Sequence, residues 1–199
     1  MWSCFSTNSW RILIMPLLRI THQRGAFTEA QKAQLAEELT SAILIAEVGA
    51  DTPAGRSLAY VLFDEVDPKT SWYVGGKPDT SPPKGGRFLF DVVFPVGACT
   101  QADKTALHET INRIIANTLD VDGSFPNRAG DWVFVHEVPN GSWGASGQTI
   151  GIREINHVVG GAPERSDYFE SLLAAQERVR AAHGFPSEER RGQAQPEAA

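Results

Sequence analysis

An internal repeat with an offset of 72 residues is the feature that most constrains this fold. When the sequence is aligned with itself at that offset, Gly25 falls on Gly97 and Gly75 falls on Gly147, and no gap is needed between them. The matching positions keep the same order of turn, helix and strand signals, and they include the pairs Thr28 and Thr100, Lys32 and Lys104, Leu35 and Leu107, Arg56 and Arg128, and Glu65 and Glu137. A shared period of this kind indicates a duplicated supersecondary unit.

Each copy has a strand-like segment at both of its ends. Leu17–Thr21 and Leu58–Val66 bound the first copy, and Phe88–Phe94 and Trp132–Val138 bound the second. These segments are rich in branched and aromatic residues, which favour a buried strand. The distance along the chain between the two strands of a copy leaves room for a crossover helix, as parallel pairing requires.

A helix is predicted between the strands of each copy. Thr28 is followed three residues later by Gln31, and Thr100 by Asp103, a spacing that is typical of a helix start. The helices are expected to end near Gly49 and Gly123. Apolar residues recur at three- and four-residue spacing and define one buried face: Leu35, Leu39, Ala42, Ile43 and Ala46 in the first copy, and Leu107, Ile111, Ile114, Ile115 and Leu119 in the second.

Two such β-α-β units predict an α+β fold with a four-stranded sheet and two helices on one face. Because the crossover of a β-α-β unit has a fixed hand, both helices are expected on the same side. The other face of the sheet is then left open, and an open apolar face favours association. We therefore expect a homo-oligomer.

The sequence divides into a duplicated core and two flanking segments. The copies are expected at 16–78 and 88–150 within a domain 16–155, joined by the turn-rich linker Asp79–Gly86. A helix is predicted over Ser166–His183, inside a C-terminal helical segment 156–186. Residues 1–14 are interpreted as an N-terminal extension, and residues 187–199 as a disordered tail.

Composition excludes several classes of partner. The formal net charge is −6 and there is no long run of Lys or Arg, so neither nucleic acid nor a membrane surface is an expected partner. The apolar stretch Ile12–Leu18 is far shorter than the ~20 residues of a membrane-spanning helix. The only cysteines, Cys4 and Cys99, form no disulfide framework or metal motif, so we expect a cytoplasmic protein without a metal or other cofactor.

The first copy opens with Met15-Pro16-Leu17-Leu18-Arg19-Ile20, and with this segment the chain resembles the tautomerase superfamily. The similar elements also include Phe63-Asp64-Glu65-Val66, His136-Glu137-Val138-Pro139 and the glycine turn after each second strand. Coverage runs from about Pro16 to Ile155, and the fused double-unit members, cis-3-chloroacrylic acid dehalogenase and malonate semialdehyde decarboxylase, are the most similar. The resemblance implies a homotrimer, a small-molecule substrate and an amino-terminal proline exposed by removal of methionine.

A chain-terminal proline nitrogen is a secondary amine, and it can act as a general base near pH 7 if burial lowers its affinity for a proton. The nitrogen of an internal proline is an amide and has no such basicity. Two interpretations follow for Pro16. Either the chain starts at Met15 and residues 1–14 are an upstream artefact, which we favour, or the extension is real and the catalytic group is disabled.

Other functional residues of the family are largely absent at the matching positions. The segment Phe94–Thr100 lacks the arginine pair that holds substrate carboxylates in the fused members, and 4-oxalocrotonate tautomerase has a strand arginine where this chain has Tyr60. Ile43, Phe134 and about Ala145 stand where the dehalogenase has a histidine, a tyrosine and a glutamate. The surroundings of Pro16 are thus expected to be mostly apolar, which suits a keto-enol proton shift better than hydrolysis.

The candidate substrate-binding residues are Arg128, Phe134, His136 and Trp143. Arg128 and its repeat partner Arg56 are candidates for a carboxylate or enolate anchor, or else surface residues paired with acidic neighbours. His136 is a candidate acid or a structural histidine. Phe134 and Trp143 are candidate pocket walls, although a tryptophan after a strand is more often a packing anchor.

Three functions follow from these residues. The first is a cofactor-independent tautomerase that acts on an oxo acid or an aromatic enol, with Pro16 as general base. The second is a hydratase, dehalogenase or decarboxylase of a small three-carbon acid. The third is a non-catalytic protein with the tautomerase fold, in which Pro16 is internal.

Overall fold

The computed structural model describes residues 16–187, so the expectations for residues 1–14 and for most of the 187–199 tail lie outside the described part of the chain. Five helices occur within this range: α1 (Glu29–Val48), α2 (Pro53–Arg56), α3 (Gln101–Leu119), α4 (Ile152–Val159) and α5 (Pro163–Ala182). The main strands are β1 (Leu17–Gln23), β2 (Tyr60–Val66), β5 (Phe88–Pro95) and β6 (Trp132–Val138). Two short hairpins pair β3 (Tyr73–Val74) with β4 (Lys77–Pro78) and β7 (Trp143–Ala145) with β8 (Gln148–Ile150).

The four main strands form one mixed sheet in the order β2-β1-β5-β6. β1 runs parallel to β2 and β5 runs parallel to β6, while β1 and β5 are antiparallel, with Leu17 opposite Val93. Each parallel pair is one copy of the repeat, and the copies meet along the centre of the sheet. The predicted α+β fold with two fused β-α-β units is therefore confirmed.

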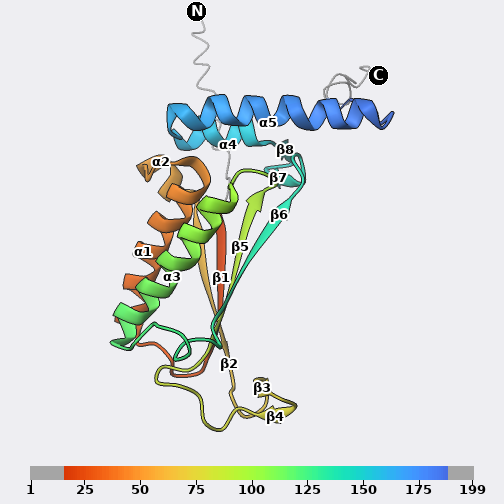
Figure 1. Cartoon of the computed structure of the whole chain (residues 1–199). Helices are drawn as coiled ribbons and strands as arrows, with labels where there is room; N and C mark the ends of the chain where they lie inside the picture. The colour runs from red at the N-terminus through yellow and green to blue at the C-terminus, as the bar shows by residue number, and fades with distance from the viewer. Residues whose placement is uncertain (1–15, 188–199) are drawn as a thin grey trace, which may run out of the picture.

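Helices α1 and α3 cover one face of the sheet (Figure 1). Each starts at a capping box in which the threonine hydroxyl accepts a hydrogen bond from a backbone N–H: Thr28 from Gln31 and Thr100 from Asp103, both at 3.2 Å. α1 ends at Gly49, which adopts a left-handed conformation (φ 71°). α3 ends at Leu119, earlier than expected, because Asp120 takes the left-handed cap (φ 51°) that the sequence analysis assigned to Gly123.

The core lies between these helices and the sheet. Strand positions alternate, as a pleated strand requires, and the side chains that face the helices are buried: Leu18 and Ile20 from β1, Phe88, Phe90, Val92 and Phe94 from β5, Leu35, Leu39 and Ile43 from α1, and Leu107, Ile111 and Ile115 from α3.

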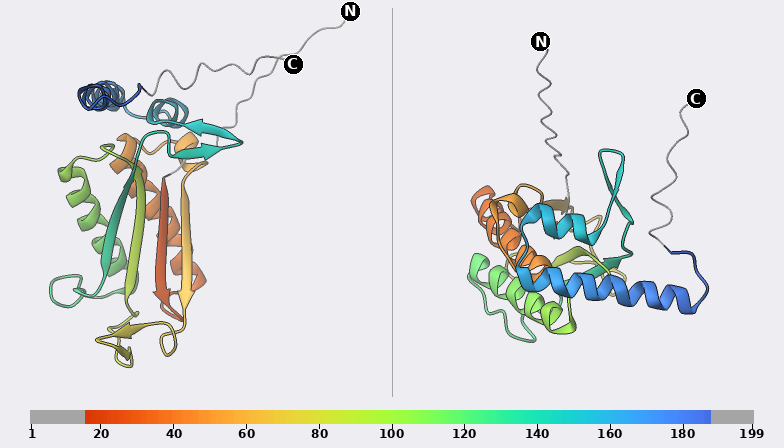
Figure 2. Two further views of the ribbon diagram at one scale, coloured as in Figure 1. Left: turned by 90° about the vertical axis from the view of Figure 1, so that its right-hand side faces the viewer. Right: turned by 90° about the horizontal axis from the view of Figure 1, so that it is seen from above.

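The opposite face of the sheet carries no helix layer in the described chain, as Figure 2 (left) shows. Trp132 and Phe134 on β6 stack with their ring centroids 6.4 Å apart and are 58% and 45% exposed. Tyr60 and Leu62 on β2 are also exposed large hydrophobic residues. We call the face formed by these four residues the open face.

The C-terminal segment forms a second layer at one end of the sheet. The predicted helix over Ser166–His183 corresponds to α5, which starts earlier, and the shorter α4 precedes it. α4 was not predicted because it has only eight residues and follows Gly151; the Asn140 side chain stabilises its start by accepting a hydrogen bond from the Ile152 N–H at 2.9 Å. α5 extends past the sheet on the side of the open face (Figure 1).

Two negative findings apply to residues 16–187. No helix in this range has both the length and the apolar character that crossing a membrane requires. In the same range, no three His, Cys, Asp or Glu side chains are grouped so that they could hold a metal ion.

Candidate functional site

β1 starts at the end of the sheet that α4 and α5 cover (Figure 1), and Pro16, which directly precedes this strand, is buried. Its carbonyl oxygen accepts a hydrogen bond from the backbone N–H of Tyr60 at 3.0 Å, so Pro16 directly precedes the first β1–β2 pair, Leu17 with Tyr60. Alternation along the strand puts Pro16 on the side of the sheet that carries Leu18 and the helices. Its surroundings are thus the apolar interior.

The C-terminal end of α1 reaches the same end of the sheet. The thiol of Cys99, in the turn after β5, contacts the carbonyl oxygen of Ala46 at 3.3 Å. Arg165 of α5 donates to the carbonyl oxygens of Ala46 and Ala98 and binds the carboxylate of Asp103 at 3.0 Å. Chain segments from α1, the β5–α3 turn and α5 are therefore tied together near the start of β1.

Glu47 is the functional candidate that the sequence analysis missed. The residue is 1% exposed, and neither carboxylate oxygen has a hydrogen-bond partner among residues 16–187. Burial raises the pKa of Glu47 well above its ordinary value. A signal was present in the sequence, because Glu47 follows Leu39 and Ile43 at four-residue spacing and so places a carboxyl on the apolar face of α1.

The other ionisable groups near this end are satisfied or inactive. Burial, together with the charge of Glu47, raises the pKa of the Cys99 thiol to about 12, so Cys99 is not an activated nucleophile. Burial works to raise the pKa of Asp103, but hydrogen bonds from Arg165 and Thr100 outweigh it and hold that pKa below its ordinary value. Asp103 is therefore ionised and paired at neutral pH.

Arg128 lies at the opposite end of the sheet from Pro16. Its side chain is 3% exposed, contacts Asp131 at 2.6 Å and donates to the carbonyl oxygens of Lys84 and Gly86. The guanidinium also lies over the Phe88 ring, 5.1 Å from its centroid. Phe88 is six residues from Phe94, the position across from Pro16, which is about 20 Å along a strand. Within one protomer, the structure does not bring Arg128 and Pro16 together.

Arg56, the repeat partner of Arg128, is held by two carboxylates. It binds Asp51 through two hydrogen bonds of 2.6 Å and Glu37 through one of 2.6 Å. The hydrogen bonds from Arg56 lower the pKa of Asp51. Arg56 thus fastens the α1–α2 connection, which corresponds to the pairing alternative that the sequence analysis left open.

Phe134 and His136 both lie on the open face, opposite to the side that carries Pro16. The ring nitrogen Nε2 of His136 lies 2.7 Å from a carboxylate oxygen of Asp91 on the neighbouring strand. His136 is in register with Val93, which pairs with Leu17, so it is one residue from the level of Pro16. These side chains are available to a second protomer that packs on the open face.

Trp143 lies in the β7–β8 hairpin, next to α4. It is half-buried and packs against the core, and its indole N–H has no hydrogen-bond partner among residues 16–187. This position is at the same end of the sheet as Pro16 (Figure 1). Of the four predicted substrate-binding residues, Trp143 therefore lies at the same end of the sheet as Pro16 within the protomer. His136 lies within one residue of the level of Pro16 along the strands, but on the opposite face of the sheet.

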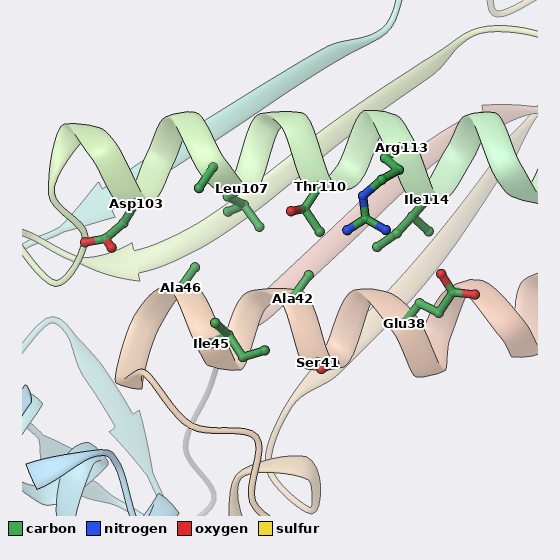
Figure 3. A pocket seen from close by; sticks show the side chains of 11 residues that line it. Glu38, Ser41, Ala42, Ile45, Ala46, Asp103, Leu107, Thr110, Arg113 and Ile114 are labelled. Atoms are coloured by element: carbon green, nitrogen blue, oxygen red, sulfur yellow. The ribbon is translucent and has the colours of Figure 1, made fainter. Parts of the chain in front are cut away.

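A separate cavity of about 390 Å³ lies between α1 and α3, on the helical side of the molecule (Figure 3). Its lining combines the apolar side chains of Ile45, Leu107 and Ile114 with the charged side chains of Glu38 and Arg113. Pro16 does not line it. Asp103 also lines the cavity but is paired with Arg165, and Glu38 accepts a hydrogen bond from Gln34, so neither carboxylate is an unpartnered base.

Comparisons with known proteins agree with this architecture. The family model Tautomerase_3, described as "Putative oxalocrotonate tautomerase enzyme", matches residues 15–151. A native fused 4-OT structure is 25% identical, with a TM-score of 0.54 over 73% of this chain and 99% of that chain. A wild-type fused 4-OT described as an asymmetric trimer is 25% identical, with a TM-score of 0.53 over 67% and 95% of the two chains.

A third solved structure, from the cis-3-chloroacrylic acid dehalogenase family, is 19% identical, with a TM-score of 0.54 over 84% of this chain and 99% of that chain. At this identity the likeness concerns the fold alone. In the comparison with curated proteins, no match was found.

Proposed function

Because the chain belongs to the family of oxalocrotonate tautomerase enzymes, in its fused double-unit form, we propose that it catalyses the cofactor-independent keto-enol tautomerisation of an oxo acid or aromatic enol. Pro16 is the general base, as the first residue of a chain from which Met15 has been removed. The observation that carries this proposal is the position of Pro16: it is buried directly before β1, and the family match begins at the Met15-Pro16 pair.

The proposed reaction moves one proton between two atoms of the substrate. The neutral prolyl nitrogen takes the proton of the enol hydroxyl. It then returns a proton to the other carbon of the enol double bond, the one without the hydroxyl, and this gives the ketone. This chemistry requires a base within hydrogen-bond reach and an environment that disfavours the ammonium before the substrate binds. The apolar residues around Pro16, with Leu18 and Phe94 fully buried, support that environment.

We further propose that the protein acts as a homotrimer, as fused 4-OT relatives do. Exposed Trp132, Phe134, Tyr60 and Leu62 on the open face support association, because apolar surface of this kind favours burial. In the trimer, Phe134 and His136 contribute to a neighbouring protomer's substrate pocket, and Trp143 forms a wall near Pro16. Arg128 is not part of this pocket, since its side chain is buried against Asp131. A reducing cytoplasm is the proposed setting, and the buried free thiol of Cys99 is compatible with it.

The test uses a chain expressed so that Pro16 is its first residue. We expect this chain to ketonise phenylenolpyruvate, and we expect Pro16→Ala in the same chain to lower kcat/KM by about 100-fold or more, in the range of general-base effects. Equal rates for the two chains would contradict the proposal. Turnover of a halo-acrylate, with no effect on phenylenolpyruvate, would favour a dehalogenase instead.

A further inference from the structure

Resting on the proposed function, we propose that Glu47 is the positioning residue of the prolyl nitrogen. In a chain that begins at Pro16, the buried Glu47 carboxylate accepts a hydrogen bond from the prolyl N–H. It thereby orients the nitrogen lone pair towards the substrate and partly offsets the apolar surroundings, which disfavour the ammonium.

Glu47 lies at the end of the sheet where β1 begins. The Cys99 contact with Ala46 brings the last turn of α1 to the end of the sheet where β1 begins. Four residues of a helix rise about 6 Å, and two residues of a strand rise almost the same distance. Leu39, Ile43 and Glu47 on α1 therefore rise at the same rate as Ile20 and Leu18 of β1 and Pro16 directly before it, and the proposal places Glu47 level with Pro16.

The Glu47 carboxyl group is without a hydrogen-bond partner in the described part of the chain. A buried carboxyl that has no hydrogen bond costs several kcal/mol in general, and native proteins rarely tolerate one without a reason. Both oxygens of Glu47 lack a partner among residues 16–187, where the nitrogen of Pro16 is bonded to the preceding residue. A chain-terminal prolyl nitrogen would supply the missing N–H donor at this level of the core.

The second copy of the repeat provides an internal comparison for Glu47. The offset of 72 places Glu47 on Leu119 and Pro16 on Phe88. Leu119 is also buried at the end of its helix, and it packs against Gly85, three residues before β5. An apolar side chain at this helix position is therefore compatible with the fold. The acidic side chain, Glu47, occurs in the copy that begins with proline.

Charged groups from the neighbouring elements do not compensate Glu47. Arg165 of α5 is committed to Asp103 and to the carbonyl oxygens of Ala46 and Ala98. Other ionisable groups of these elements also have partners: Glu137 of β6 pairs with Lys104 of α3, and Arg153 of α4 pairs with Glu170 of α5. Glu154 accepts a hydrogen bond from the Gly151 N–H, and Cys99 is a neutral thiol. Burial is accordingly the cause that raises the pKa of Glu47.

The first experiment is a pH profile of kcat/KM for phenylenolpyruvate, measured on the chain that begins at Pro16. An adjacent carboxylate favours the ammonium form of the prolyl nitrogen and so raises its pKa. Removal of the carboxylate charge lowers this pKa, and the neutral amine is then present at lower pH. We expect Glu47→Gln to move the acidic limb of the profile down by about one pH unit or more. The control Glu29→Gln removes the same charge from the exposed first residue of α1, and we expect it to leave the profile in place. An unmoved profile in Glu47→Gln would overturn the inference.

The second experiment needs no activity and keeps the inference separate from the proposed function. Glu47→Leu, the residue used by the second copy, is introduced into the chain that begins at Pro16 and into a chain with one alanine before Pro16. At pH 8 we expect the variant to raise the Tm of the alanine-preceded chain, where the carboxyl has no partner, and to lower that of the chain with a free prolyl nitrogen. The same shift in both chains would overturn the inference. Absence of turnover in the unmutated chain would instead count against the proposed function.

Discussion

The backbone N–H of Tyr60 donates a hydrogen bond to the carbonyl oxygen of Pro16, with the two atoms 3.0 Å apart. This bond holds Pro16 directly before the first β1–β2 pair through its carbonyl group, and the prolyl nitrogen takes no part in it. The sheet can therefore hold Pro16 in the same place whether its nitrogen is an amide or a free amine. A chain that begins at Pro16 and a chain in which Pro16 is internal therefore differ in the chemistry of the prolyl nitrogen and not in their fold.

Replacement of Arg128 is expected to destabilise the protein. Its guanidinium is buried against Asp131, and burial raises the pKa of Asp131 even though Arg128 pulls it down. In Arg128→Met, the Asp131 carboxylate loses its partner, which should lower the free energy of unfolding by about 3 kcal/mol. Urea unfolding measures the change. The control Arg24→Gln, at an exposed arginine, should cost less than about 1 kcal/mol, and equal losses in the two variants would count against a structural role for Arg128.

The acid sensitivity of the fold should depend in part on Asp103. In the folded protein, hydrogen bonds from Arg165 and Thr100 lower the pKa of Asp103 although burial acts to raise it. The ionised carboxylate therefore stabilises the fold at pH values above its pKa in the unfolded chain. This stabilisation is lost as the pH falls through its pKa in the folded protein. We expect Asp103→Asn to be less stable by about 1 kcal/mol at pH 7 and to approach the unmutated protein at pH 3. Thermal melts across this range test it, with Glu109→Gln on the same helix as control. A constant difference at all pH values would contradict the assignment.

The open face should mediate assembly. Phe134→Glu places a charge in the centre of the exposed aromatic residues of β6, and burying that charge between protomers is unfavourable. We expect this variant to sediment as a monomer in analytical ultracentrifugation, while the unmutated protein sediments as a trimer. Ile45→Glu introduces the same charge at an exposed residue of α1, on the other side of the molecule, and should leave the trimer intact. Dissociation by Ile45→Glu but not by Phe134→Glu would locate the interface elsewhere.

The sequence was sufficient to predict the main fold because local signals and the repeat agree. The caps at Thr28 and Thr100 and the bounds of β6 were predicted correctly, since capping side chains and alternating apolar residues act over a few residues. The short hairpins β3–β4 and β7–β8 were expected only as glycine turns, and α4 was not predicted. These elements are too short for a periodic pattern and depend on contacts such as the one between Asn140 and Ile152.

The candidate site was less predictable, because its geometry depends on which ends of the strands meet. Arg128 carries the same type of side chain as a substrate anchor, and nothing in its local sequence indicates that Asp131, Lys84 and Gly86 occupy its donors. Glu47 was overlooked because α1 was recognised by its apolar positions, and the one charged residue that continues their spacing was not counted among them.

The most direct test of the account compares two chains that differ by one residue: one that begins at Pro16 and one that carries a single alanine before it. The rate of phenylenolpyruvate ketonisation is measured for both at pH 7.5, after circular dichroism has established that they have the same fold. We predict catalysis by the chain with the free prolyl nitrogen and only the uncatalysed rate with the other. Equal catalysis by both chains would contradict a role for the Pro16 nitrogen as the base.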